Sequence, residues 1–488
     1  MTNSTRSVFS SDDPSIVWAC PGGGAKGCGT RDDPFTSVSH AISRARPGST
    51  VALLNGRYRG DVTVQVSGTV ERPIRIAGAG DGVAEIFEGC WYFYDTSDLI
   101  LSDLVFRNSP HGAVSVVGAC RRNSFRSLHF ANCSTREGSC TMFFGGSGAR
   151  CNIVEECVFE AAPGNGKTVT DVRQQTIGIM VSEGDPADRR TLNRDHVFRR
   201  NTIRNYGCGV LIGSRGSGDT LHGHIVENNS IADCAGDGIR VKCGDTMLRA
   251  NVVAGCRGSA IALSLGESST IADNRIERCT TGIRVLGPGH TLRNNCILSC
   301  LRESVRIAAD AEDGAAPASN IILENNTCVQ AEPGMDMREP MGIRIEPGTS
   351  CVVRRNLFAG RGMPYAVGAG SRAPRAVLVK DNLHSGGSSA AEGCAAGEVS
   401  FADPDADNYE NDSAYGAHGW MARGRQMIAG CADTEGYREA EMEHAGSRPG
   451  VADALVQDID RRELLTRSMF YGGEIDAGGN LHEPPDSD

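Results

Sequence analysis

The chain has 488 residues with 61 glycines and 5% aromatic residues, which is long for one compact core but suits a solenoid that grows by adding coils. The formal net charge of −11 argues against general nucleic-acid binding. No stretch has the roughly 18 consecutive apolar residues of a membrane span, so we expect neither nucleic acid nor membrane as a partner.

The first predicted unit is residues 1–49. Its first 20 residues contain no basic segment followed by an apolar run, so the sequence as given predicts a cytoplasmic protein, or a secreted or periplasmic one if a leader is missing. In residues 34–46, helical spacing is shown by Phe35, Val38, Ala41, Ile42 and Ala45. We expect a helix that caps the first coil, because an open solenoid end exposes backbone and core.

The second predicted unit is residues 50–385. Its first coils should have strands at 50–54, 61–66 and 73–77, separated by turns at Asn55-Gly56, at Gly60 and from Gly68 to Pro73. Two strand-turn-strand units follow within residues 85–160. The pattern is interrupted at 161–194, 309–319 and 330–340, and such insertions usually build the binding face of a solenoid.

One phrase recurs in the middle of this unit. The motif Asn-x-(Ile/Val) begins at Asn201, Asn229, Asn251, Asn274 and Asn295, so its copies are 28, 22, 23 and 21 residues apart. A second phrase, Gly-(Ile/Val)-x-(Ile/Val), follows at Gly209, Gly238 and Gly282. Two short alternating strands per repeat of about 22 residues predict an all-β fold, a right-handed parallel β-helix solenoid, in which the asparagines form a hydrogen-bonded ladder.

The chain has nineteen cysteines. Four of them recur five residues after ladder asparagines and should pack inward as a second column, which Tyr206 begins: Cys234, Cys256, Cys279 and Cys300. The pairs Cys20/Cys28 and Cys133/Cys140 could form disulfides in an oxidising compartment. There is no CxxC pair, which argues against a structural zinc site.

The third predicted unit is residues 386–488, an irregular C-terminal cap or flap. It begins with the linker-like SGGSSAAEGCAAGE and continues with an acidic segment. One helix is expected within it, at 451–466.

Arginines recur on the Gly-Ile-x-Val strands. The residue between two inward apolar residues points outward, which places four arginines on one external face, interrupted by Ala262: Arg240, Arg284, Arg306 and Arg344. Guanidinium groups stacked about 5 Å apart repel one another unless anions lie between them. One interpretation is a groove for an acidic, uronate-containing glycan. The other is that these arginines pair with acids such as Asp237, Glu303 or Glu346.

Lysine is rare in this chain. Of 49 basic residues, four are lysine, at Lys26, Lys167, Lys242 and Lys380, which leaves 45 arginines. Lys242 lies two residues after Arg240, and an ammonium beside another cation should release its proton more readily, as a lysine general base requires. The alternative is an exposed lysine at a strand end.

These motifs resemble polysaccharide lyase family 6, the chondroitinase B and alginate lyase group. That family has an asparagine shortly before a Gly-Ile strand and, one coil later, two acids two residues apart with a lysine five residues after the second acid. Here NYGCGVLIG supplies Asn205, and CAGDGIRVKC supplies Asp237 and Lys242. The resemblance covers about residues 50–385.

The resemblance implies a calcium ion held by Asn205 and Asp237 that neutralises the uronate carboxylate, with Lys242 removing the C5 proton and an arginine one coil later assisting the leaving oxygen. The chain departs from the family twice: Ala235 replaces the first acid, and Leu263 or Ser264 stands where the arginine is expected. Another proton donor would then be needed, and the candidates are Arg284, Arg257 and Tyr206.

Three functions remain open. The first is a carbohydrate-active lyase or C5-epimerase whose partner is an acidic polysaccharide or oligosaccharide, with substrate contacts from Arg240, Arg257, Arg306 and Arg344. The second is a β-helix enzyme with a small intracellular substrate, and the third is a non-catalytic glycan-binding or structural β-helix. A weaker similarity to polygalacturonase-type hydrolases, in residues 209–216 and 238–242, lacks the carboxylate pair that hydrolysis needs.

Overall fold

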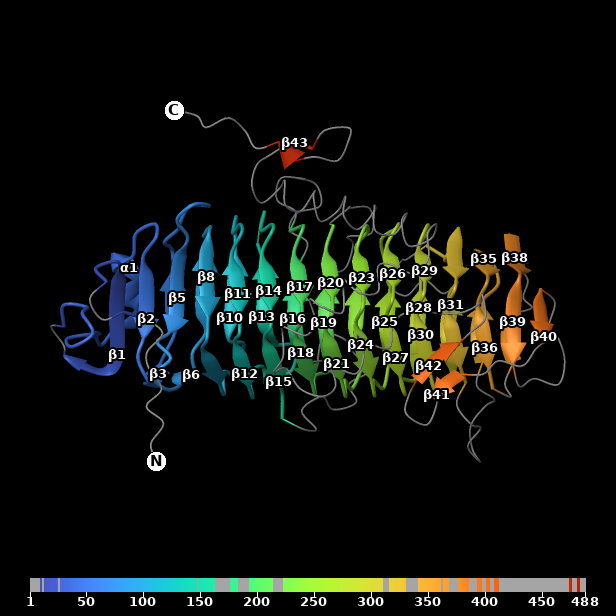
Figure 1. The fold of residues 1–488 in the computed structure, drawn as a ribbon, viewed down its shortest axis with the longest axis horizontal. Helices are drawn as coiled ribbons and strands as arrows, with labels where there is room; N and C mark the ends of the chain where they lie inside the picture. Colours follow the sequence, from blue (N-terminus) through green and yellow to red (C-terminus); the bar gives the residue numbers. More distant parts are fainter. Residues whose placement is uncertain are drawn as a thin grey trace.

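The protein is an elongated right-handed parallel β-helix, as the sequence predicts, and its coils follow one another in chain order along the long axis (Figure 1). The computed structural model describes residues 9–10, 13–24, 27–146, 148–162, 176–182, 193–213, 223–309, 316–330, 341–360, 363–367, 376–385, 393–396, 401–403, 408–411, 474–475 and 481–482.

Three long parallel sheets form the wall of the helix. Sheet A, in order, contains β1 (Ile16–Gly24), β2 (Thr50–Leu53), β5 (Ile74–Gly78), β8 (Leu99–Ser102), β11 (Ser124–Arg126), β14 (Ile153–Glu155), β17 (Val197–Arg199), β20 (Ile225–Glu227), β23 (Met247–Arg249), β26 (Thr270–Ala272), β29 (Thr291–Arg293), β32 (Ile321–Glu324), β35 (Ser350–Arg354) and β38 (Ala376–Lys380). Sheet B contains β3 (Gly56–Arg59), β6 (Ala84–Phe87), β9 (Val105–Arg107), β12 (His129–Ala131), β15 (Val158–Glu160), β18 (Thr202–Arg204), β21 (Ser230–Ala232), β24 (Val252–Ala254), β27 (Arg275–Glu277), β30 (Cys296–Leu298), β33 (Thr327–Val329), β36 (Leu357–Ala359), β39 (Asn382–Ser385) and β40 (Cys394–Ala396).

Sheet C completes each coil and carries the candidate site. It contains β4 (Val62–Val64), β7 (Trp91–Tyr94), β10 (Val114–Val117), β13 (Cys140–Gly145), β16 (Ile177–Val181), β19 (Cys208–Ile212), β22 (Ile239–Val241), β25 (Ser259–Leu263), β28 (Thr281–Val285), β31 (Glu303–Ile307), β34 (Met341–Ile345) and β37 (Met363–Val367). The expected turn around residues 55–60 is wrong, because β3 occupies most of it and supplies the sheet B strand of the first coil.

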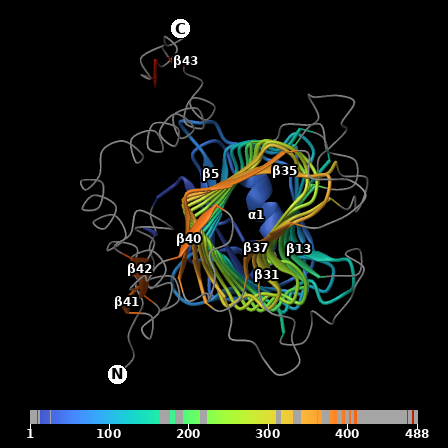
Figure 2. The same ribbon diagram turned by 90° about the vertical axis from the view of Figure 1, so that its right-hand side faces the viewer.

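The N-terminal helix α1 (Val38–Arg44) is shorter than the predicted 34–46. It begins after Ser37, whose hydroxyl accepts a hydrogen bond from the His40 N–H at 3.2 Å, and it ends where Ala45 turns to an extended conformation. Val38, Ala41 and Ile42 are buried, so the helix closes the end of the first coils as expected (Figure 2). Strand β1 lies ahead of it, pairs with β2, and was not predicted.

The predicted asparagine ladder is confirmed. Each side-chain amide donates to the Oδ1 atom of the asparagine one coil later at 2.9–3.0 Å, and the backbone N–H of the same residue donates to that oxygen at 2.9–3.1 Å. The ladder continues beyond Asn295 through Asn326, Asn356 and Asn382. These side chains are almost completely buried, and this bonding satisfies them.

A second buried ladder, not predicted, lies where the chain enters sheet A. In each coil, one backbone N–H at this point donates to a side chain of the next coil. The acceptors are Oδ1 of Asn123 and Asn152 and Nδ1 of His196 and His224. Two coils further on, the Ser269 N–H donates to Nδ1 of His290 at 3.1 Å.

The column of Tyr206, Cys234, Cys256, Cys279 and Cys300 is buried as predicted. All described cysteines are free thiols, including the four considered for disulfides, Cys20, Cys28, Cys133 and Cys140. Cys133 is buried in the core.

Beyond β40 the structure describes two antiparallel pairs, β41 (Phe401–Asp403) with β42 (Asn408–Asn411), and β43 (Glu474–Ile475) with β44 (Leu481–His482). The helix expected at 451–466 and most of the predicted insertions lie outside the described residues. In the described part of the chain, no helix has the length and apolar character needed to cross a bilayer.

Candidate functional site

The predicted arginine row lies on the outer face of sheet C. Paired strands place these residues in register from coil to coil, with Ala262 as the interruption: Arg240, Ala262, Arg284, Arg306 and Arg344. Each neighbour is one strand spacing away, about 4.8 Å. The sequence prediction of a shared external face is therefore confirmed.

Asp237 and Arg240 form an ion pair at the start of this row. Both Nε and Nη2 of Arg240 donate to Oδ2 of Asp237, at 2.6 and 2.5 Å. The other carboxylate oxygen, Oδ1, accepts the backbone N–H of Ser259 at 2.7 Å. Both oxygens are therefore engaged, and Asp237 is only 5% exposed. This pairing supports the alternative in which the row arginines bind neighbouring acids.

Lys242 directly follows β22, and its backbone N–H donates to the carbonyl of Ile212 at 2.7 Å. Its side chain is buried, with 6% exposed, so the alternative of an exposed strand-end lysine is wrong. The pKa of the Cys208 thiol is raised to about 12, mainly by burial and also by the charge of Asp237, while Arg240 and Lys242 lower it. Asp237, Arg240 and Lys242 therefore act electrostatically on the same buried thiol.

Further along the row, Arg306 pairs with Glu346. Nε and Nη2 of Arg306 donate to Oε1 of Glu346 at 2.7 and 2.6 Å, and the Ala309 N–H donates to Oε2 at 2.8 Å. Burial raises the pKa of Glu346, but the Ala309 hydrogen bond and the charges of Arg306 and Arg344 outweigh it, so the pKa of this carboxyl is below its usual value. Arg344 itself is exposed.

Tyr206 is not available as a proton donor on the outer face. Its ring is fully buried and its hydroxyl hydrogen-bonds Thr141 Oγ1 at 2.9 Å inside the helix. Burial is also the main reason that the pKa of Tyr206 lies far above its ordinary value. This corrects the assignment of Tyr206 as a catalytic candidate.

Asn205 and Arg257 lie in the turns that lead from sheet B to sheet C. Asn205 has a left-handed conformation with φ of 67°, and its Nδ2 donates to the Ala161 carbonyl at 3.3 Å. The Arg257 side chain is exposed. At the position where the resembling family has an arginine, Leu263 points into the core and is fully buried, while Ser264 is 6% exposed.

These residues do not fit a calcium site. Calcium takes six to eight oxygen ligands. Here Asp237 already uses both oxygens, and Ala235 contributes none. Among the described residues, no group of three or more His, Cys, Asp or Glu side chains could hold a metal ion.

The same row continues into an apolar half that sequence analysis missed. Upstream of Arg240, the outward positions in register are Leu211, Met180, Phe143, Ser115 and Tyr92. The rings of Tyr92 and Tyr94 are stacked, with centroids 6.2 Å apart. In WYFY, the alternation of inward and outward positions would have indicated Tyr92 and Tyr94 as outward side chains.

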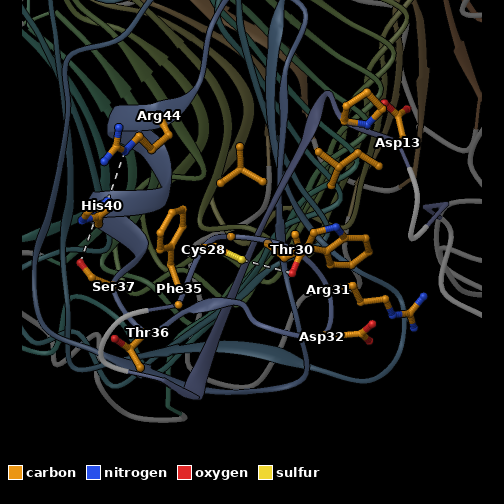
Figure 3. Close-up of a pocket in the computed structure, with 16 residues that line it drawn as sticks. Asp13, Cys28, Thr30, Arg31, Asp32, Phe35, Thr36, Ser37, His40 and Arg44 are labelled. Atoms are coloured by element: carbon orange, nitrogen blue, oxygen red, sulfur yellow. Dashed lines mark hydrogen bonds between the residues drawn. The ribbon is translucent and has the colours of Figure 1, made fainter.

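A cavity lies elsewhere, at the N-terminal end of the solenoid. It measures about 1000 Å³ and is found between β1 and α1, lined by residues that include Cys28, Phe35 and His40 (Figure 3). Lys242, by contrast, follows β22 in the middle of the solenoid. The candidate site is therefore an open face of sheet C rather than this cavity.

Fold and site together define a right-handed parallel β-helix protein with a charged outer face on one sheet. A family model described as a right-handed beta helix region matches residues 191–372. A family 6 alginate lyase, AlyGC, superposes with a TM-score of 0.61 at 18% identity, covering 80% of this chain and 56% of that one. The present chain thus spans just over half of AlyGC.

Two further lyases of this family superpose on a larger share of their own length. A mannuronic acid specific family 6 lyase from human gut microbiota gives a TM-score of 0.56 at 19% identity, with 75% of this chain and 88% of that chain covered. A family 6 lyase from Pseudopedobacter saltans gives 0.55 at 15% identity, with 78% and 95% covered. No curated protein matches the sequence. The resemblance to family 6 is confirmed in the fold.

Proposed function

We propose that the protein binds an acidic, uronate-containing glycan along the outer face of sheet C and acts on it by proton abstraction at Lys242, as a lyase or a C5-epimerase. The observation that carries this proposal is the buried position of Lys242, two residues after Arg240 at the start of a row of arginines in register. The solved lyases with this fold include an alginate lyase described in complex with a trisaccharide, which supports a glycan as the ligand.

The face suits such a chain chemically. Arginine forks match carboxylate geometry, and since Arg240 and Arg306 already form ion pairs with Asp237 and Glu346, Arg284 and Arg344 would supply most of the positive charge for uronate carboxylates. The apolar half, from Tyr92 to Leu211, offers surface on which the C–H faces of sugar rings can pack. A glycan lying along the solenoid axis would contact both halves in turn.

In the proposed step the unprotonated amine of Lys242 takes the proton α to the uronate carboxylate. The bonding pair moves into the carboxylate as an enediolate, which Arg240 and Arg284 stabilise by charge. In elimination this pair then forms the carbon–carbon double bond, the bond to the leaving oxygen breaks, and that oxygen takes a proton. In epimerisation a second group donates a proton to the opposite face of the same carbon, and no bond to oxygen breaks.

The structure bears on the choice between these outcomes. Elimination needs a donor to the leaving oxygen, and with Leu263 in the core and Tyr206 buried, the remaining candidates are Arg257 and Arg284. Epimerisation needs no donor to the leaving oxygen, but it needs a group that donates a proton to the opposite face of C5. Both outcomes therefore need one donor besides Lys242, and the test below separates them.

A second candidate is a non-catalytic glycan-binding β-helix. The specific observation in its favour is that both carboxylate oxygens of Asp237 are already bonded, one to Arg240 and one to the Ser259 N–H. Such a group stabilises the coil, and its two oxygens already accept three hydrogen bonds. This candidate predicts glycan binding without a product.

The test is incubation with alginate, dermatan sulfate and polygalacturonate, with and without calcium. Ultraviolet absorbance of an unsaturated sugar marks elimination, and a changed uronate stereochemistry in the NMR spectrum marks epimerisation.

We expect Lys242→Met, which keeps most of the buried volume, to lower the rate by at least about a hundredfold. Arg204→Gln, which changes an exposed pair with Glu160 on sheet B, is the matched control. Full activity of Lys242→Met would refute the mechanism, and binding without product would favour the second candidate.

A further inference from the structure

A second set of stacked arginines lies away from the sheet C row, where the chain passes from sheet C into sheet A. Arg121, Arg150 and Arg194 follow one another in parallel register on three successive coils. Their backbone N–H groups repeat the same bond to the previous coil, donating to Thr96, Cys120 and Ala149 at 2.9, 2.9 and 3.0 Å. The three side chains therefore start about 4.8 Å apart.

The charges of this arginine ladder are not balanced by the described carboxylates. The adjacent Arg122 is neutralised, because its Nε and Nη2 bond the two oxygens of Asp98 at 2.7 Å each. Among the described residues, Oδ2 of Asp195 lies 3.6 Å from Nε of Arg194, and Asp245 lies near enough to raise the pKa of Asp195. The three guanidinium groups therefore outnumber the carboxylates described around them.

Arg121 and Arg150 show the effect of this imbalance. Among the described residues, Nε of Arg121 is buried without a hydrogen-bond partner. Burial, followed by the charges of Arg121 and Arg194, lowers the pKa of Arg150. A buried donor without a partner costs free energy, and three cations in a row repel one another, so an anion in this position would remove both penalties.

Other arginine columns of the same wall are built differently. The outer column of sheet A alternates in register between arginine and glutamate, through Arg126, Glu155, Arg199, Glu227 and Arg249. The pairs close at 2.8 Å for Arg199 with Glu155 and at 2.6 Å for Arg249 with Glu227. The coils can therefore neutralise arginines where only stability is needed. The ladder of Arg121, Arg150 and Arg194 departs from this arrangement.

A cavity lies at the ladder. It measures about 270 Å³ and is lined by Arg121, Arg122, Arg150, Cys151, Arg194 and Asp195. Its size suits one sugar unit with its anionic group rather than a long chain. Its coils are those of β10, β13 and β16, which also carry the apolar half of the sheet C row.

We propose that the cavity at Arg121, Arg150 and Arg194 is a second, non-catalytic binding site for an acidic glycan, at which the carboxylate of one uronate unit lies among the three guanidinium groups. The class of ligand rests on the proposed function of the sheet C face. The oxyanion chemistry itself, planar forks around a carboxylate, follows from the ladder.

The experiment is calorimetric titration of the full chain with a uronate trisaccharide, a neutral glucose trisaccharide and sodium sulfate. We expect two uronate sites in the wild type, and Arg150→Gln to weaken one of them by about tenfold or more. Arg204→Gln is the matched control, because its arginine is paired with Glu160 and exposed. Arg306→Gln should weaken the other site. Hydrogen exchange of residues 148–155 should slow with the uronate trisaccharide in the wild type and not in Arg150→Gln.

The outcomes separate this inference from the proposed function. Unchanged uronate binding in Arg150→Gln, or an equal loss in Arg204→Gln, would overturn the second site. Binding of sulfate without the trisaccharide would also overturn it, because the ladder would then be a site for a small free oxyanion. Uronate binding that depends on Arg150, in a protein that forms no product, would support the second site while the catalytic proposal fails.

Discussion

His290 should make the stability of the β-helix sensitive to acid. Its ring is fully buried, with Nδ1 accepting the Ser269 N–H at 3.1 Å and Nε2 donating to the Leu286 carbonyl at 3.0 Å. Both nitrogens of the neutral ring are therefore satisfied. A proton added at Nδ1 would face the Ser269 N–H and would be buried as a charge. Burial is the main cause of the lowered pKa of His290, about 4 against the ordinary 6.5.

The sign and size of the effect follow from proton linkage. Between about pH 4 and pH 6.5 the unfolded chain binds a proton at this histidine and the folded chain does not. The contribution is fully present above about pH 6.5 and is lost as the pH falls toward about 4, to a limit of about 3 kcal/mol. Going from about pH 7 to about pH 4.5 should remove about 2 kcal/mol of it.

The perturbation is His290→Asn, which keeps an acceptor at a position equivalent to Asn123 and Asn152 of the same ladder. Urea unfolding, followed by circular dichroism at about pH 7 and about pH 4.5, should show that the wild type loses about 2 kcal/mol more than the variant. His111→Asn, at an exposed position, is the matched control. The reasoning would be refuted by equal acid losses in the wild type and His290→Asn.

Three further predictions concern the ladder, a coil turn and the sheet C row. Asn274→Ala should lower the free energy of unfolding by about 3 kcal/mol or more, because it leaves several buried bonds of its neighbours unmade, and urea unfolding measures the loss. Gly266→Ala should destabilise far more than Gly60→Ala in the same assay: both have positive φ, but the new methyl group would lie 2.2 Å from the Cys243 backbone carbon at the first and would meet nothing at the second. Arg306→Ala should raise the pKa of Glu346, followed by NMR titration, and weaken uronate binding about tenfold.

The periodic features of the fold could be predicted from sequence, because each coil repeats the same inward and outward positions. The asparagine ladder, the cysteine column and the arginine row are all of this kind. The ladder of histidines and asparagines before sheet A also repeats once per coil, and His196 and His224 directly precede apolar strand residues. It was missed because its residue type changes from coil to coil. Strand β1 was missed because it precedes the first repeat.

The sequence offered Asp237, Glu303 and Glu346 as possible partners of the row arginines, but it could not show which of these acids form ion pairs. Asp237 and Arg240 are three residues apart, which in a regular strand would place them on opposite faces. Asp237 lies just before β22, between Gly236 and Gly238, so the alternation does not extend to it and both side chains meet outside. The burial of Lys242 likewise depends on the neighbouring coil. Gly213 of that coil packs against Lys242, and a methyl group added at Gly213 would lie 3.0 Å from Cβ of Lys242.

The departures at Ala235 and Leu263 are compatible with an intact fold, because the stability of a solenoid is approximately a sum of coil terms and contacts between adjacent coils. The side chain of Leu263 belongs to the apolar core of its coil, so it stabilises the fold and does not reach the outer face. Lys242 differs, because taking a charged side chain out of water costs free energy and its side chain is nevertheless buried beside the arginine row. The proposed proton abstraction would require a basic side chain at this end of the row.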